Sequence, residues 1–391
     1  FTNTTGTANV GIGYQALYTN NGNYNTALGY NALVSSTTGS DNVAMGYNTL
    51  DANTTGANNT AIGTQALTGN TTASNNTAVG KNALKVNSTG ADNNAFGAEA
   101  LEANTTGGDN NAFGKQTLTA NTTGSGNTAM GHAALDANTT ADNNTAFGKI
   151  ALTDNTTGHS NVAIGVASLD DNTTGTGNVG VGMNSLGQNT TASGNTALGD
   201  EALAVNTTGS GLVAVGKDAL KSNTTANNNT AVGYDALTAN TTAAQNTAVG
   251  SQALITNTTG GNLTAVGMNA LFSNSTASNN VAVGYGSMEN NSTGAQNTAV
   301  GTEALKANTT ASNNTAMGYH ALKANTTGGR NIAIGNYAFD TQTSSGSYNV
   351  GVGYAVGDAV STAQYCTFIG DVVGDAVTTG AGNTGVGGGT L

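Results

Sequence analysis

Residues 46–63 read GYNTLDANTTGANNTAIG, and residues 63–80 repeat the pattern as GTQALTGNTTASNNTAVG. The glycine that opens each copy, called slot 1 here, recurs in unbroken steps of 17 from Gly29 to Gly335. One further copy precedes this series and three follow it, with steps of 16 and 18 at the two joints, so the chain holds 23 copies. Self-similarity at a short fixed period is the signature of a repeat architecture.

The consensus of one copy is G-x-x-A-L-x-x-N-T-T-G-x-x-N-T-A-Φ, where Φ is Val, Ile, Leu, Met or Phe. This unit is too short for two helices, and its Asn, Thr and Gly disfavour helix. Two short extended segments joined by two turns fit it, with the glycines of slots 1 and 11 in turn conformations. Coils of this kind stack in register about 4.8 Å apart, and each is stabilised by its neighbours. We therefore predict an all-β parallel β-solenoid of about 23 coils, regular over residues 1–339 and continued by variant coils over residues 340–391.

Like residues of successive coils are expected to form columns inside this solenoid. Leu at slot 5 and Φ at slot 17 are predicted to be its apolar columns, while Ala at slots 4 and 16 stays small where backbones or another chain approach closely. Asn at slots 8 and 14 is predicted to form amide ladders, in which each side chain donates to the next and can therefore be buried. The residues predicted for these columns are Leu33, Leu50, Leu67, Val79 and Asn76.

The composition excludes several classes of partner. Charged residues make up only 8% of the chain and the net charge is −12, so nothing would neutralise the phosphates of a nucleic acid. No apolar run approaches the roughly 20 residues of a membrane helix. The single cysteine, Cys366, excludes an intrachain disulfide. The chain starts at Phe1 without a signal peptide, as a processed exported chain or a fragment would.

The motif at Asn76–Ala83, NTAVGKNA, resembles the head repeats of trimeric autotransporter adhesins, which form a left-handed parallel β-roll. The variant at Cys366–Gly370, CTFIG, is similar to repeats of phage tail-fibre proteins. The resemblance covers essentially all coils. It implies a left-handed solenoid at the cell or virion surface, with an adhesive or structural role and often a trimeric state.

The two ends of the chain suggest a second mode of self-association. The chain closes on slots 1–5 and opens on slots 6–11, so one copy followed by another would continue the repeat in phase. Most of the 12 tyrosines lie near the ends, and tyrosine is enriched at protein interfaces. We therefore predict head-to-tail stacking into a filament that does not close. The residues predicted for this interface are Phe1, Tyr14, Tyr18, Tyr24, Tyr337, Tyr348, Tyr354 and Leu391.

No catalytic or metal-binding constellation is evident. The three histidines occupy different slots of separate coils, at His132, His159 and His320. The densest acidic group, within residues 358–375, lacks the glycine–aspartate repeat of calcium-binding β-rolls. No slot places an acid, a base and a nucleophile together, so we predict that the protein is not an enzyme and needs no cofactor.

The polar slots leave two further questions. Asn-x-Thr triplets such as Asn53–Thr55 match the acceptor of N-linked glycans, but no glycan can attach if slot 8 faces inward. Neighbouring threonines at slots 9 and 10 face opposite ways, so only one column can point outward. The leading expectation is an extracellular structural fibre subunit whose main partner is itself. The alternatives are a module that binds ice or a surface polysaccharide through its threonines, and a trimeric tail-fibre shaft.

Overall fold

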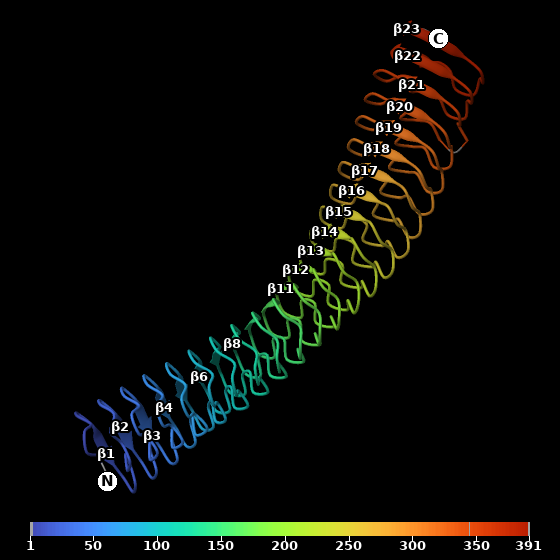
Figure 1. The fold of residues 1–391 in the computed structure, drawn as a ribbon. Helices are drawn as coiled ribbons and strands as arrows, with labels where there is room; N and C mark the ends of the chain where they lie inside the picture. Colours follow the sequence, from blue (N-terminus) through green and yellow to red (C-terminus); the bar gives the residue numbers. More distant parts are fainter. Residues whose placement is uncertain (1–2, 344, 390–391) are drawn as a thin grey trace. The chain divides into compact units, whose positions relative to one another are not determined.

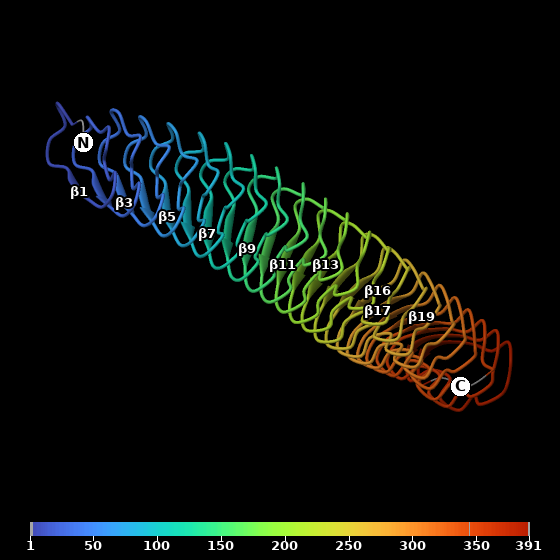
Figure 2. The same cartoon turned by 90° about the horizontal axis from the view of Figure 1, so that it is seen from below.

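The computed structural model describes residues 3–343 and 345–389, and this part of the chain contains no helix. The protein is all-β, with 23 short parallel strands stacked as a β-solenoid about 17 residues apart (Figures 1 and 2). The predicted fold class is confirmed. The predicted interface residues Phe1 and Leu391 lie outside the described residues.

Each coil contributes one strand, in most cases from slots 15–17. The chain divides into two units, Phe1–Gly194 with strands β1–β11 and Asn195–Leu391 with strands β12–β23. The strands are β1 Val10–Ile12, β2 Thr26–Leu28, β3 Val43–Met45, β4 Thr60–Ile62, β5 Thr77–Val79, β6 Asn94–Phe96, β7 Asn111–Phe113, β8 Thr128–Met130, β9 Thr145–Phe147, β10 Val162–Ile164, β11 Val179–Val181, β12 Thr196–Leu198, β13 Val213–Val215, β14 Thr230–Val232, β15 Thr247–Val249, β16 Thr264–Val266, β17 Val281–Val283, β18 Thr298–Val300, β19 Thr315–Met317, β20 Ile332–Ile334, β21 Val350–Val352, β22 Thr367–Asp371 and β23 Thr384–Gly388.

Within each unit, consecutive strands pair slot against slot. In the pair β4–β5, for example, Ala61 lies opposite Ala78. The longer coil between β20 and β21 keeps this register, because Ile332 still lies opposite Val350. The extra residue is therefore accommodated outside the strands. A shift of the strand pairing by one residue would turn every strand side chain to the opposite face of the sheet. A coil with one extra residue therefore accommodates that residue in a turn.

In the coils that the structure describes, the second extended segment expected in each coil is not formed. The A-L-x-x-N-T-T segment forms turns instead, because slots 3 and 5 have left-handed backbones, as at Asn48 (φ 49°) and Leu50 (φ 54°). A left-handed conformation costs a leucine about 1–2 kcal/mol. Burial of the side chain and bonds between coils offset this cost, since the Leu67 backbone N–H, for example, donates to the Ala83 carbonyl at 3.0 Å. Backbone hydrogen bonds between coils thus continue beyond the strands.

The core contains fewer apolar columns than predicted, because slot 17 does not contribute to it. Slots 4, 5, 8, 11, 14 and 16 face inward, and the side chains of Leu33, Leu50, Leu67 and Asn76 are fully buried. The prediction for Val79 was wrong, because this residue is partly exposed. Strand side chains alternate in direction, and alanine takes the inward position at slot 16. The bulky Φ residue of slot 17 therefore points outward.

Two amide ladders run through this core. At slot 14, the Asn59 side chain and backbone both donate to Asn42 Oδ1, at 3.1 and 3.0 Å. At slot 8, the Asn70 side chain donates to Asn53 Oδ1 at 3.0 Å. From Asn20 to Asn349, the asparagines of both slots are buried. In these coils, the Asn-x-Thr triplets that start at slot 8 therefore offer no accessible acceptor for an N-linked glycan in the folded chain. Asn3, at slot 8 of the first coil, is partly exposed.

Slot 11 holds only glycine or alanine in the regular coils, and the reason is not the turn conformation that the sequence predicted. Its glycines do not have left-handed backbones, and alanine occupies the slot in other coils, as at Ala73. The Ala73 carbonyl accepts hydrogen bonds from Asn70 Nδ2 and Asn59 Nδ2, both at 3.0 Å. Slot 11 thus lies between the two ladders, where only a hydrogen or a methyl group fits.

In the variant coils near the C-terminus, a larger side chain at one inward slot is matched by a smaller residue at the slot that it contacts. Phe339 takes the place of the usual leucine at slot 5, and Gly351 takes the place of the usual alanine at slot 16. A Cβ atom on Gly351 would lie 2.5 Å from Phe339 Cε2. The larger residue therefore requires the smaller one.

Gly351→Ala is expected to lower the free energy of unfolding by about 1–3 kcal/mol through overpacking. The double variant Gly351→Ala with Phe339→Leu should recover stability, because it restores the residues of the regular coils. The coupling energy should be about 0.5–3 kcal/mol in a double-mutant cycle followed by urea unfolding. Simple addition of the two single costs would contradict this account of the packing.

Candidate interaction surfaces

The outward side of the strands carries a column of bulky apolar residues. Because alanine faces inward at slot 16, the side chains of slots 15 and 17 face solvent, and this surface is called the strand face below. Phe147 of β9, for example, is 49% exposed. No charged residue occupies slots 15–17 in any strand from β1 to β23, all of which lie in the described part of the chain. The most exposed slot-17 side chains are Ile12, Leu28, Met45, Ile62, Phe96, Met130, Phe147, Ile164, Leu198, Met317, Ile334, Ile369 and Val386.

Aromatic residues stack along and beside this strand face. At slot 2, directly after the strands, the rings of Tyr14 and Tyr30 lie 5.0 Å apart and those of Tyr30 and Tyr47 lie 5.5 Å apart. At slot 17, Phe96 and Phe113 stack at 4.9 Å. The coil spacing matches the separation that stacked rings prefer, so the repeat itself aligns these side chains. The apolar column is widened where tyrosines occupy slot 2.

The tyrosines predicted for a head-to-tail interface lie on several sides of the solenoid. Tyr14 and Tyr354 border the strand face at slot 2, and the ring of Tyr337, at slot 3, meets Tyr354 edge-on at 6.0 Å. Tyr24 and Tyr348 occupy slot 13. The remaining predicted tyrosine, Tyr18, occupies slot 6. The structure does not gather these residues on one surface, and their role in end-to-end contact stays a prediction.

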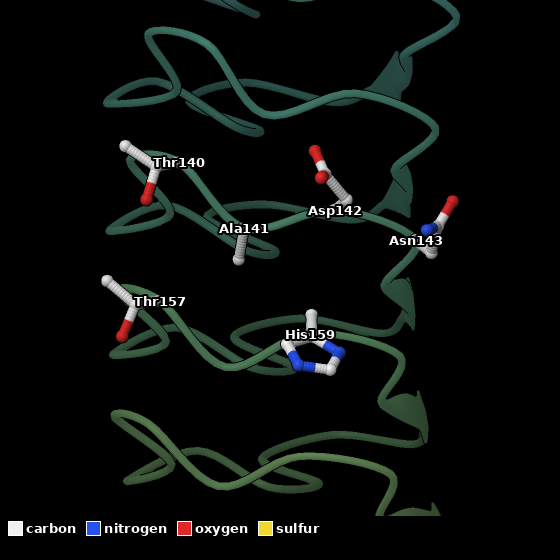
Figure 3. Close-up of a pocket in the computed structure, with 6 residues that line it drawn as sticks. All are labelled: Thr140, Ala141, Asp142, Asn143, Thr157 and His159. Carbon is white, nitrogen blue, oxygen red and sulfur yellow. The ribbon is translucent and has the colours of Figure 1, made fainter.

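A polar groove follows slots 10–13 on another side of the coil, and is called the threonine groove below. Figure 3 shows Thr140 and Thr157 in one column, with Asp142 and His159 beside them. These residues line a hollow of about 320 Å³ whose floor is Ala141 at slot 11. In the second unit, the same slots from Thr310 to Tyr348 line a hollow of about 300 Å³. The same slots therefore line a hollow in each of the two units.

The two threonines of each coil have different roles. At slot 9, Thr122 Oγ1 donates to the Thr139 carbonyl of the next coil at 2.9 Å and is part-buried. At slot 10, the neighbouring Thr123 is exposed. This agrees with the expectation that only one column faces outward. The sequence alone did not indicate which of the two columns it is.

The largest charged cluster lies in the second unit around Glu303. Its carboxylate contacts Lys306 Nζ and Lys323 Nζ, both at 2.8 Å, and His320 Nε2 at 3.0 Å. Hydrogen bonds from the two lysines lower the pKa of Glu303 to about 2. Burial raises the pKa of the nearby Asp340 carboxyl. The charges compensate one another between neighbouring coils, as in a surface ion-pair network.

The three histidines lie at different slots of the repeat. His132 lies at slot 2, His159 in the threonine groove and His320 in the charged cluster. Within the residues that the structure describes, no group of three or more potential metal-ligating side chains is found. The Cys366 side chain is buried at slot 14, with its Sγ 3.4 Å from the Gly380 carbonyl.

Comparisons with protein-family models and with curated proteins return no match for this chain. The fold defines the class as a parallel β-solenoid repeat protein. Among the described residues, no helix is long and apolar enough to cross a membrane. The surfaces that distinguish this solenoid are therefore the strand face and the threonine groove.

Proposed function

We propose that this protein is a structural fibre subunit at a cell or virion surface, and that its copies associate side by side through the strand face. The observation that carries this proposal is the uncharged, apolar outward column of slot 17. The resemblance of the repeats to adhesin heads and tail fibres supports the surface location and a trimeric assembly.

The chemistry of the strand face favours a protein partner. Extended apolar patches on a soluble protein commonly mark interaction sites, and the centres of interfaces are depleted in charge. The charged residues of this chain instead occupy turn slots, as Lys81 does at slot 2 and Glu102 at slot 6. Charge is thus kept away from slots 15–17, although many side chains there are exposed. Asp371, the last residue of β22, lies at slot 2.

A second copy of the chain is the partner that fits this column best. It carries apolar residues with the same spacing from coil to coil, so contacts made by one coil can be repeated by the next. Symmetric association of identical surfaces is the commonest route to an oligomer. The buried amide ladders and the backbone bonds between coils would hold neighbouring coils of one unit in register, so that several coils of that unit can engage together.

Head-to-tail stacking is a second mode of assembly within this proposal. It rests on the tyrosines of the outer coils, since tyrosine is enriched at protein interfaces. These tyrosines lie on several sides of the coils. The strand face, in contrast, is described along both units, and side-by-side association is therefore the mode that we test first.

Charges introduced into the strand face are expected to separate the copies. The triple variant Phe96→Glu, Phe113→Glu and Met130→Glu should convert the oligomer to monomers at micromolar concentration, because unpaired charges would be buried in the contact. Sedimentation velocity and light scattering would measure the mass. The matched control is Thr68→Glu, Thr119→Glu and Thr153→Glu at slot 6, where the chain itself carries Glu102.

The control adds the same charge outside the strand face and should leave the oligomer intact. A wild-type chain that remains monomeric at high concentration would contradict the proposal. So would a strand-face variant that keeps the wild-type mass.

A further inference from the structure

We propose that the threonine groove is a binding site for an extended, uncharged polysaccharide. The site is separate from the strand face, and the proposal does not depend on side-by-side association. It goes beyond the expectation of a general threonine surface by naming the groove, its hydrogen-bonding groups and the class of ligand.

The first observation is the constancy of slot 10. This slot holds threonine in every coil from Thr38 to Thr327, in steps of 17, and each of these threonines is exposed. The other exposed slots vary freely. Slot 2 holds Tyr, Lys, Asp and Val among others, and slot 13 holds Asn, Asp, Gly and Tyr. Packing seldom constrains an exposed side chain, so packing does not explain this uniformity.

The fold does not use the slot-10 hydroxyl. The slot-9 hydroxyl bonds to the next coil, and serine replaces threonine there at Ser88 and Ser275. At slot 10, in contrast, no hydroxyl from Thr38 to Thr310 forms a hydrogen bond to another group in the described residues. Each such side chain therefore presents an unused hydroxyl and a methyl group to whatever occupies the groove.

The shape of the groove allows a ligand to approach the backbone. Its floor is slot 11, where only glycine or alanine fits between the amide ladders. Its far wall is slot 12, which most often holds Ser, Ala or Gly. The hollow at Thr310 is bordered by such small residues, Ser312, Gly329 and Ser347. The hollow at Thr140 is bordered instead by Asp142 and His159, so the groove stays open where slot 12 is larger.

Backbone N–H groups add donors to the groove. The slot-12 N–H points along the groove toward the next coil, where a serine side chain accepts it in some pairs, as between Ala57 N–H and Ser74 Oγ at 3.1 Å. The next residue in this slot, Ala91, has no acceptor for the N–H of Ser74. That N–H and the equivalent N–H of Ser312 form no hydrogen bond within the described residues. Oxygen atoms of a ligand can accept these bonds.

The spacing and charge of the groove select the ligand class. The hydroxyls recur about every 4.8 Å, so a ligand with hydroxyls repeated along a line can engage several coils at once and gain avidity. Slots 10 and 11 carry no charge in any coil, and the charged residues of slots 12 and 13 are mostly acidic, at Asp41, Asp92, Asp109 and Asp142 with Arg330 as the exception. This charge and the net charge of −12 disfavour a polyanion. An extended neutral polysaccharide has both properties.

The test uses the full chain and a soluble mixed-linkage β-glucan, with binding followed by affinity electrophoresis and calorimetry. Alginate serves as the charged comparison. The variant Thr89→Val, Thr106→Val, Thr123→Val and Thr140→Val keeps the side-chain shape but removes four hydroxyls. It should weaken binding at least about tenfold. The matched control is Thr68→Val, Thr119→Val and Thr153→Val at slot 6, where the chain itself carries Val34, and it should bind like the wild type.

A measurement on the wild type keeps the test independent of any effect of the variants on folding. Glucan should slow amide hydrogen exchange in peptides that cover slots 10–13 and leave the strand peptides unchanged. The proposal is overturned if the wild type fails to bind glucan at millimolar concentration, if the slot-10 variant binds as well as the control, or if alginate binds more tightly than glucan. If the wild type shows thermal hysteresis and the slot-10 variant does not, the threonine column binds ice, and the proposal is overturned. An intact mass above 38.2 kDa, with the added mass on slot-10 threonines, would also overturn it, because the groove would then be covered.

Discussion

Replacing Asn127 by Asp is expected to destabilise the first unit by about 3–5 kcal/mol at pH 7, although the two side chains have nearly the same shape. Asn127 is fully buried at slot 14. Its Nδ2 donates to Asn110 Oδ1 at 3.2 Å and to the Ala141 carbonyl at 2.9 Å. A carboxylate cannot donate, so it would place a buried negative charge against two acceptor oxygens.

The cost of this variant should depend on pH in a defined direction. Burial and the facing oxygens would raise the pKa of the new carboxyl in the folded state above its unfolded value of about 3.9. Between these two pKa values the folded state binds more protons than the unfolded state. The free energy of unfolding then falls as pH rises through this window. The variant should therefore be more stable at pH 4 than at pH 7, relative to the wild type.

The matched control for this substitution is Asn127→Leu. The chain itself carries leucine at slot 14, at Leu212 and Leu263, where both side chains are buried. A leucine loses the donated bonds but brings no charge, so we expect a cost of about 1–2 kcal/mol with no pH dependence. Urea unfolding at pH 4 and pH 7 measures both variants. Equal costs for Asp and Leu at pH 7 would contradict the buried charge as the cause of the larger cost of Asn127→Asp.

Replacing Gly131 by Ala is expected to lower the free energy of unfolding by about 3–5 kcal/mol, from backbone strain and overpacking together. Gly131 occupies slot 1 with φ at 136°, a conformation that side chains rarely adopt. A Cβ atom there would lie 2.3 Å from the carbonyl oxygen of Gly148 in the next coil. Neither backbone can retreat without breaking the hydrogen bonds between the coils.

Gly124→Ala, at slot 11, is the informative comparison. An added Cβ would lie 2.4 Å from the Ala141 carbonyl oxygen, a contact nearly as close as the one at Gly131. The backbone of Gly124 is not left-handed, however, and other coils already hold alanine in this slot. We therefore expect a change of about 1 kcal/mol or less, followed by urea unfolding and by hydrogen exchange in the flanking coils. Similar costs at the two glycines would mean that the positive φ angle is not the reason why slot 1 requires glycine.

Much of this architecture could be predicted from the repeat. A fixed period with the same residue type in each slot implies that like groups lie at the same height, because only a stacked coil uses such uniformity. The buried leucine column and the amide ladders at slots 8 and 14 follow from that argument, as Leu50 and Asn76 show. The absence of a helix follows from the same composition.

The direction of the strand side chains was not predictable in this way. Both Ala78 and Val79 are apolar, and the usual preference for burying the larger residue favoured the valine. The structure buries Ala78 instead. In the regular coils, where slots 3, 5 and 13 have left-handed backbones, the space behind the strand holds the methyl group of an alanine. The variant coil of β22 instead buries Phe368 at this slot.

The sequence by itself therefore determined the period, the register and the residues that stack, because these depend only on which residues recur. The tertiary structure decided the width of the interior, and with it the apolar strand face and the outward threonine column. The physical reason is that the width of a closed coil depends on the backbone angles of all its residues together. No single slot specifies that width, so the inward and outward faces became clear only when the coil was closed.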